Sequence, residues 1–422
     1  MRYPVIIALV IIAAVFITGC MNSTPGNAGN LPAAGQGEVE VDALLPLTGV
    51  GSSLGESSKA ALLTAEEDIN RYYSEIGSPT RIRVVIHDTG SDPATALLRT
   101  GEVHATGRMF VVGYLGSAEL SAIKDYIDKN GMIAISSGST APALAIPDDS
   151  IYRMISDDTA QGKFMAAYIG SEKIDAIIPI RRGDVWGDSL SNLTRSAFRA
   201  QGGTAFEGVR YDPDTTDFNA AVNSLDVLAG GAIEEYGAGS VGIYAVTFNE
   251  IGSIMDLAAG KPNLSRVRWF GSDGNTLDPS LSGTSPAARF AASVNMTGMM
   301  WGIPVQDPES SQVTRIKERL HREPDGSSIA LYDTLWVVMG VMEETPVNAS
   351  QAQRARALVR HLDTYSGVSS DMTVNDAGDR ILASYDIIKV IAKPSGSEWK
   401  KVAQIRMWPY STREEIIPYS QS

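Results

Sequence analysis

After residue 38, apolar and polar positions follow two periods in turn. Short runs of consecutive or alternating apolar residues, typical of strands, are separated by segments in which apolar residues recur with helical spacing. Expected strands span 39–45, 81–87, 109–115, 132–136, 176–180, 241–246 and 267–270, and expected helices span 57–73, 94–106, 117–129 and 189–201. This alternation predicts βαβ units, and therefore an α/β fold built on parallel sheets.

The start of the chain has a different pattern. Arg2 is followed by the apolar run Val5–Ile17 and then by Thr18-Gly19-Cys20. The run is short for a membrane-spanning helix, which needs roughly 20 apolar residues. A charged start, an apolar stretch and small residues before a cysteine are typical of a lipoprotein signal peptide, cut before Cys20, whose sulfur then carries a lipid. A plain N-terminal membrane anchor with an incidental cysteine is the alternative.

Residues 21–38 are rich in Gly, Ala, Asn and Pro and lack apolar periodicity, which predicts a flexible tether. No later stretch is apolar for long enough to span a bilayer. We therefore expect residues 1–20 to be the signal peptide and the remainder to be a soluble, extracytoplasmic body, anchored to the membrane through Cys20.

Composition narrows the classes of partner. A chain of 422 residues is too long for one small core, so two lobes or domains are expected. Its 44% hydrophobic content is that of an ordinary globular protein. A formal net charge of −14 repels nucleic acid, so we expect no nucleic-acid partner. Cys20 is the only cysteine, which excludes an intramolecular disulfide.

Two strings are similar to hydrolase motifs. Residues 51–55 fit G-x-S-x-G, but that elbow needs its serine directly after a strand, and residues 46–49 separate Ser53 from the expected strand. Residues 187–190 read GDSL, but an esterase of that type also needs an Asp three residues before a His. None of the four histidines has one: His87, His104, His321 and His361. We expect Asp188-Ser189 to cap the following helix instead. An extracellular hydrolase built on Ser53 or Ser189 is the alternative.

Cofactor and metal signals are weak. Gly49, Gly51 and Gly55 have the spacing G-x-G-x-x-x-G, which differs from the dinucleotide-binding fingerprint, and no acidic residue ends a strand about 20 residues further on. Scattered histidines and one cysteine do not predict a transition-metal site. We expect neither a cofactor nor a metal.

Three loops that follow expected strands suit a zwitterionic ligand. Gly116-Ser117 opens a helix, and residues 136–140 (SSGST) follow another strand. Small residues there let backbone N–H groups and hydroxyls reach a carboxylate. Residues 271–274 (GSDG) place Asp273 between glycines, where it can accept a bond from an ammonium group. Ligands of open α/β sheets bind beyond the carboxyl ends of strands, which is where all three loops lie. Ordinary turns and helix caps are the alternative interpretation.

Together these strings resemble the leucine/isoleucine/valine-binding proteins of ABC importers, from about Val39 to Val390. The resemblance is carried in order by residues 44–70, residues 113–144, Tyr211–Phe218, Tyr332-Asp333 and residues 366–380. It implies a type I periplasmic-binding fold, with two doubly wound lobes, 39–152 plus 305–375 and 153–304 plus 376–422, that close over a ligand. It also implies three crossover hinges, near 148–156, 303–308 and 373–380.

The resemblance also implies roles for individual residues. Ser117, Gly138 and Thr140 would hold the ligand carboxylate, with Ser139 positioning the loop. Asp273 stands where the family has a glutamate that accepts the ammonium. The remaining implied ligand contacts are Trp186 and Thr247 at tyrosine positions, Phe248 beside the latter, and the apolar Leu54. These departures reshape the pocket and leave the ligand class open, and Trp186 could instead be an exposed surface residue.

The resulting hypothesis is a non-enzymatic, monomeric, lipid-anchored solute-binding protein. It would capture an amino acid or a related amide and deliver it to the membrane permease of an ABC importer. A ligand sensor of the same fold without transport is the alternative to an importer component.

Overall fold

The computed structural model of the chain describes residues 37–302, 310–407 and 414–418. The predicted signal peptide with Cys20, nearly all of the tether and the predicted crossover at 303–308 lie outside the described residues.

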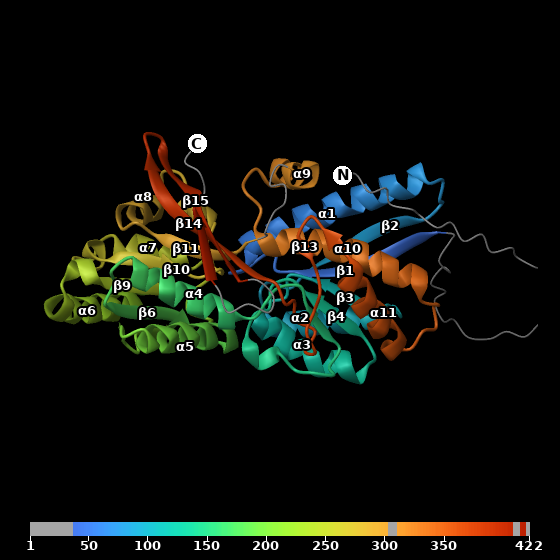
Figure 1. The fold of residues 1–422 in the computed structure, drawn as a ribbon, viewed down its shortest axis with the longest axis horizontal. Coiled ribbons are helices and arrows are strands. Elements are labelled where there is room, and N and C mark those ends of the chain that lie inside the picture. Colours follow the sequence, from blue (N-terminus) through green and yellow to red (C-terminus); the bar gives the residue numbers. More distant parts are fainter. Residues whose placement is uncertain (1–36, 303–309, 408–413, 419–422) are drawn as a thin grey trace, which may run out of the picture. The chain divides into compact units, whose positions relative to one another are not determined.

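The first sheet is parallel throughout, with strand order β2-β1-β3-β4-β5. Its strands are β1 (Glu38–Leu45), β2 (Arg81–Asp88), β3 (Phe110–Gly113), β4 (Ile133–Ser136) and β5 (Ile151–Arg153). The helices that accompany it are α1 (Ser52–Glu75), α2 (Pro93–Ala105), α3 (Ser117–Lys129), α9 (Ser311–Leu320), α10 (Gly326–Glu344) and α11 (Gln351–Thr364). Ala43 and Leu45 of β1 belong to the same apolar cluster as α1 and α10, whereas Leu44 between them packs with α2 and α3. The alternating faces of a strand therefore bury one helix layer on each side, as Figure 1 shows.

The second sheet is larger and mixed, with strand order β16-β15-β14-β11-β10-β9-β6-β7 and β8 also paired with β6. Its strands are β6 (Ala176–Arg182), β7 (Thr204–Ala205), β8 (Val209–Tyr211), β9 (Val241–Val246), β10 (Arg268–Gly271), β11 (Thr297–Trp301), β14 (Ala383–Lys393), β15 (Gly396–Met407) and β16 (Glu414–Pro418). Its helices are α4 (Asp158–Ser171), α5 (Val185–Ala200), α6 (Asn219–Tyr236), α7 (Ile251–Ala258) and α8 (Pro286–Ser293). Strands β6 to β11 are parallel, whereas β14, β15 and β16 add antiparallel strands at one edge.

The chain passes repeatedly between the two sheets. It leaves the first sheet after β5, and after β11 it returns to the first sheet, where α9 and α10 pack on α1. A two-stranded ribbon of β12 (Ser366–Gly367) and β13 (Ser370–Asp371) precedes the last passage, into β14. One parallel sheet and one mostly parallel sheet, each covered by helices, confirm the predicted fold class, and the antiparallel edge was not predicted.

Two predicted helix starts were wrong. Helix α1 begins at Ser52 rather than at 57, because residues 52–56 continue the helix through the glycine-rich string. Helix α5 begins at Val185 rather than at 189, because Asp184 and not Asp188 is its N-cap, accepting a hydrogen bond from the Gly187 N–H at 2.8 Å. Within the part of the chain that the structure describes, no helix is both long and apolar enough to cross a membrane.

Candidate functional site

A pocket opens where the strand ends of both sheets meet. The space between its walls is about 420 Å³, a volume that includes open solvent. Its lining comes from the loops after β1, β2, β3, β6 and β9: Pro46, Val50, Gly51, Ser91, Tyr114, Gly116, Ser117, Ala118, Glu119, Arg182, Asp184, Trp186 and Phe248. These loops lie beyond the carboxyl ends of parallel strands. Of the three loops predicted from the sequence, only Gly116-Ser117 contributes to the lining, and no residue of 136–140 or 271–274 does.

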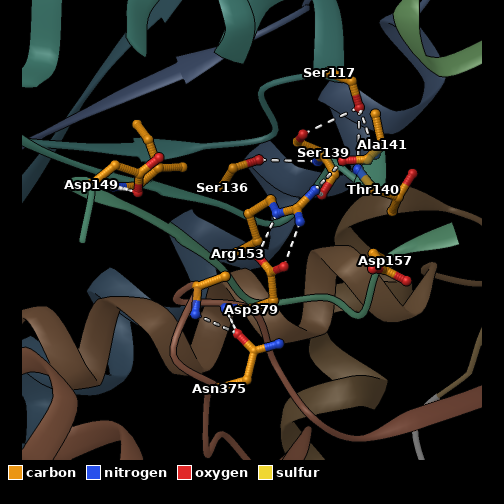
Figure 2. Close-up of polar contacts among 12 residues, drawn as sticks. Ser117, Ser136, Ser139, Thr140, Ala141, Asp149, Arg153, Asp157, Asn375 and Asp379 are labelled. Atoms are coloured by element: carbon orange, nitrogen blue, oxygen red, sulfur yellow. Dashed lines mark hydrogen bonds and ion pairs between the residues drawn. The ribbon is translucent and has the colours of Figure 1, made fainter. Parts of the chain in front are cut away.

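Ser117 organises one side of this site. Its Oγ accepts hydrogen bonds from the backbone N–H groups of Thr140 at 3.2 Å and Ala141 at 3.1 Å, and the Ser139 hydroxyl lies 3.2 Å away and donates to it (Figure 2). Gly138 lies against the Tyr114 ring, where a Cβ would come within 2.8 Å, so this loop position accepts only glycine without rearrangement. The loop predicted to hold a carboxylate thus lies beside Ser117 with its N–H groups converging. Its role in binding stays a prediction.

Two buried carboxyl groups, Asp273 and Asp158, lie near this site but are not part of the pocket lining. Asp273 accepts a hydrogen bond from Gln161 Nε2 at 2.9 Å and is 8% exposed. Asp158, in the first turn of α4, is fully buried, and among the described residues neither of its carboxylate oxygens has a hydrogen-bond partner. The Thr140 Oγ1 and Gln161 Oε1 atoms are buried and unpartnered as well.

Both carboxyl groups have raised pKa values. Burial, and next the charge of Asp273, raises the pKa of Asp158 well above its usual value, and the Thr140 hydroxyl offsets this only in part. Burial also raises the pKa of Asp273. A buried carboxylate without an ion-pair partner costs several kcal/mol, on the order of 3–5, and the charge of Arg153, which lowers the pKa of Asp158, offsets only part of this cost. A positively charged ligand group placed between the two would remove that cost.

Sequence reasoning missed Asp158. The signal available was the pair Asp157-Asp158 directly after an expected crossover, but an acidic pair before a helix is usually a cap, and Asp157 does act as the N-cap of α4.

A stacked aromatic pair forms a wall of the pocket. The rings of Trp186 and Phe248 lie 4.4 Å apart with an interplanar angle of 20°. Both rings rest on Gly274, where a Cβ would come within 2.6 Å of Trp186 Cη2 and 3.0 Å of Phe248 Cδ1. Trp186 is 4% exposed, so the alternative that it is an exposed surface residue was wrong. Because Gly274 directly follows Asp273 in the sequence, the aromatic pair lies close to Asp273, as a surface for a ligand side chain would.

Of the nine predicted contact residues, only Ser117, Trp186 and Phe248 line the pocket; Gly138, Ser139, Thr140, Asp273, Thr247 and Leu54 do not. Thr247 is fully buried, and its hydroxyl accepts a hydrogen bond from Asn275 Nδ2 at 3.0 Å. Leu54 is buried in the first turns of α1 among the core residues of the first sheet. Neither is part of the pocket lining described above.

Arg182 lines the pocket and was not predicted. Its Nε donates to Asp184 at 2.6 Å, its Nη1 lies 3.4 Å from Glu250, and its guanidinium lies 5.8 Å from the centre of the Phe248 ring. The nearby Glu119 carboxylate accepts a hydrogen bond from the Gly116 N–H, and burial raises the pKa of Glu119. The wall therefore combines aromatic rings with a charge-balanced polar rim.

The hydrolase strings have structural roles instead. Ser53 and Ser52 each lie 2.9 Å from the side-chain amide of Asn249, which follows β9, and Arg322 donates to the Ser53 carbonyl. No described histidine bonds to Ser53. Asp188 lies inside α5 and pairs with Arg181 and Arg210, so its predicted capping role was wrong.

Among residues 37–302, 310–407 and 414–418, no group of three or more His, Cys, Asp or Glu side chains could hold a metal ion.

Comparisons with known proteins identify the family of the chain. The sequence profile of the periplasmic binding protein family matches residues 38–393. An uncharacterised protein of Methanocaldococcus jannaschii is 26% identical over 337 residues, which cover 78% of each chain. Leu/Ile/Val-binding protein homolog 3 of Brucella melitensis is 21% identical over 362 residues, which cover 84% of this chain and 92% of the relative.

Solved structures share the fold. The leucine binding protein LivK of Thermotoga maritima superposes with a TM-score of 0.69 at 18% identity, over 90% of this chain and 99% of its own. The branched-chain amino acid binding protein LivJ of Streptococcus pneumoniae, solved with isoleucine, has a TM-score of 0.67 at 17% identity, over 87% and 99%. Because the family profile spans most of the chain, and relatives named as Leu/Ile/Val-binding proteins align with it, the chain belongs to the periplasmic binding protein family.

Proposed function

We propose that the protein binds an amino acid or a related small amide in this pocket and delivers it to the permease of an ABC importer. The observation that carries the proposal is the pair of buried carboxyl groups, Asp158 and Asp273, close to a loop whose N–H groups converge on Ser117. One site thus offers acceptors for an ammonium and donors for a carboxylate, which are the two groups that every α-amino acid carries.

Each part of the site would contact a different group of the ligand. The ligand ammonium would lie between Asp273 and Asp158, with the unpartnered Thr140 hydroxyl as a third acceptor. The carboxylate would take the N–H groups of Thr140 and Ala141, displacing the Ser117 hydroxyl or sharing them with it. The side chain would then lie along the rings of Trp186 and Phe248. Leucine or another apolar amino acid suits such a wall.

Relatives support the same ligand class. A Brucella relative is named a Leu/Ile/Val-binding protein homolog, and two solved neighbours contain isoleucine and leucine. A protocatechuate-type ligand, 3,4-dihydroxybenzoic acid, occupies a Rhodopseudomonas palustris neighbour of the same fold. That ligand lacks an amine, so the two carboxyl groups of this chain favour the amino acid over an aromatic acid.

The proposal extends to the anchor. The string before Cys20 supports cleavage and lipidation at that cysteine, and the tether would keep the binding body near its permease at high local concentration. In cells that import the ligand, Cys20→Ala should release the protein from the membrane fraction and reduce uptake, while purified variant and parent should bind ligand equally. Retention of the Cys20→Ala protein in the membrane fraction would contradict lipid anchoring and favour a plain anchor.

A binding screen tests the central claim. The full chain is titrated by calorimetry with the twenty amino acids, their amides and small carboxylates, and each hit is repeated with Asp273→Asn. We expect one amino acid or amide to bind at one per chain with Kd on the order of 1 μM, and to raise the melting temperature at millimolar concentration. Binding confined to carboxylates without an amine would contradict the proposal. Esterase activity abolished by Ser53→Ala would favour the hydrolase instead.

A further inference from the structure

A buried ion pair joins two of the segments that connect the sheets. Arg153 ends β5, where the chain leaves the first sheet, and Asp379 lies in the segment that leads to β14. Their side chains are buried and meet in a two-pronged contact, with Nε 2.5 Å from Oδ1 and Nη2 2.5 Å from Oδ2. The backbones are joined too, because the Arg153 N–H donates to Gly378 O at 2.8 Å and the Arg380 N–H donates to Arg153 O at 2.9 Å.

The same guanidinium reaches the predicted carboxylate loop. Its remaining nitrogen, Nη1, donates to Ala141 O at 2.8 Å and lies 3.5 Å from Ser139 O. Figure 2 shows the loop lying between Arg153 on its carbonyl side and Ser117 on its N–H side. Arg153 therefore holds the Ser139 and Ala141 carbonyls of the same loop whose Thr140 and Ala141 N–H groups converge on Ser117.

The turn that presents Asp379 is itself fixed. Asn375 accepts a hydrogen bond on Oδ1 from the Asp379 N–H at 3.0 Å, and its own N–H donates to Asp379 O at 2.8 Å. With the carboxylate held in place, only the planar fork of an arginine can satisfy Asp379 and the loop carbonyls together. A lysine would keep the charge but lose one of these contacts.

We propose that Arg153 is a positioning residue that fixes the ligand-binding loop, 137–141, to the two connecting segments, so that capture of the ligand carboxylate and movement of these segments are coupled. The coupling rests on the proposed function, because it assumes that this loop holds the ligand and that the segments act as hinges. The fixing of the loop does not depend on the identity of the ligand. The two parts can therefore be tested separately.

Hydrogen exchange on the ligand-free full chain, purified in detergent, tests the fixing of the loop. In Arg153→Lys we expect the Thr140 and Ala141 amides to exchange at least about tenfold faster, while amides of β9 keep their rate. Arg380→Lys is the matched control, because Arg380 is equally buried and adjacent but bonds to Ser369 and Asp371 instead of the loop. Should Arg153→Lys fail to fold, Asp379→Asn breaks the same fork. Unchanged loop rates, or equal acceleration by Arg380→Lys, would overturn the inference.

Calorimetry with L-leucine tests the coupling. Arg153→Lys retains the positive charge that lowers the pKa of Asp158, so a change in affinity reports loop geometry. We expect Kd to rise at least about tenfold with unchanged stoichiometry, whereas a purely structural role would lower the stoichiometry of a partly unfolded sample and leave Kd unchanged. An unaltered Kd with full stoichiometry would overturn the coupling. Failure of the wild-type chain to bind any amino acid would count against the proposed function, and the exchange rates would still decide the role of Arg153.

Discussion

Replacing Asp273 by asparagine should change stability and affinity in opposite directions. The substitution keeps the shape of the side chain and a carbonyl oxygen for Gln161 Nε2, but removes one charge from the buried pair. Burial raises the pKa of Asp273 from 3.8 to about 6, and ionisation in the folded protein is thus less favourable by about 3 kcal/mol. Without ligand, Asp273→Asn should therefore stabilise the protein, by an amount on the order of 1–3 kcal/mol.

With ligand the sign reverses. A buried ammonium that loses one of its carboxylates is short of a counter-charge, at a cost of about 2–5 kcal/mol. The corresponding loss of affinity is roughly 30-fold or more, since about 1.4 kcal/mol is a factor of ten.

Two measurements on the same samples check this prediction. Thermal unfolding without ligand should show a melting temperature raised by roughly 2–4 °C, and calorimetry should show the weakened binding. Asp226→Asn is the matched control, since Asp226 lies outside the pocket and accepts hydrogen bonds from the backbone of residues 263 and 264. A ligand-free Asp273→Asn protein less stable than wild type would refute the idea that the pair is held without a counter-charge. Unchanged affinity would show that the ligand has no amine near Asp273.

Three further predictions follow from the same geometry. Because the pKa of Asp273 is raised in the folded state, lowering the pH protonates this carboxylate and removes the partner of the ligand ammonium. The affinity of the wild type for the ligand should therefore fall as the pH drops from about 7 to 5, and the affinity of Asp273→Asn should fall less. The ligand-free protein should gain stability from this group over the same range, because the folded state binds the additional proton, and comparing the melting temperatures of the two proteins isolates that gain. Gly274→Ala should weaken binding and change Trp186 fluorescence, because its Cβ would come within 2.6 Å of the indole at a cost of about 1–3 kcal/mol. Gly231→Ala is the control, because open space surrounds Gly231 and this substitution should change neither binding nor fluorescence. Equal binding by both variants would contradict the described wall. Asn249→Ala removes the amide that bonds Ser52 and Ser53, and should accelerate ligand release about tenfold in stopped-flow fluorescence. An unchanged release rate would show that these contacts do not form when ligand is bound.

The strands of the fold were predictable because their signal is local. β9 is a buried, nearly continuous apolar run, and β1 alternates valines with acidic residues before ending in the buried Ala43-Leu44-Leu45, so both have the pattern of a strand in their own sequence. Helix α4 was missed for the opposite reason: buried residues lie all around it, from Ala160 to Ile169, and no polar face marks its period. The edge strands β14 to β16 were missed as well, because only pairing across the chain shows that they run antiparallel to β11.

The residues of the candidate site also differ in how far the sequence alone could identify them. Ser117 and Asp273 could be found from the sequence, because small residues after a strand and an acidic residue between glycines are local patterns. Asp158 and Arg153 could not, since their importance comes from what surrounds them. Asp158 is set apart by the absence of a described hydrogen-bond partner, and Arg153 by contacts with residues 226 positions away and with a loop 12 positions away.

The hydrogen bonds of Ser117 have a consequence for selectivity. Since the N–H groups of Thr140 and Ala141 already share the Ser117 hydroxyl, an entering carboxylate exchanges one acceptor for another and gains little from this exchange. An entering ammonium meets two buried carboxyl groups that form no ion pair with any described cationic side chain, so the amine should account for most of the discrimination between solutes. Acetate-like and keto-acid analogues of an amino acid should therefore be rejected far more strongly than its amide, and a cell rich in organic acids would still load this protein with nitrogen compounds.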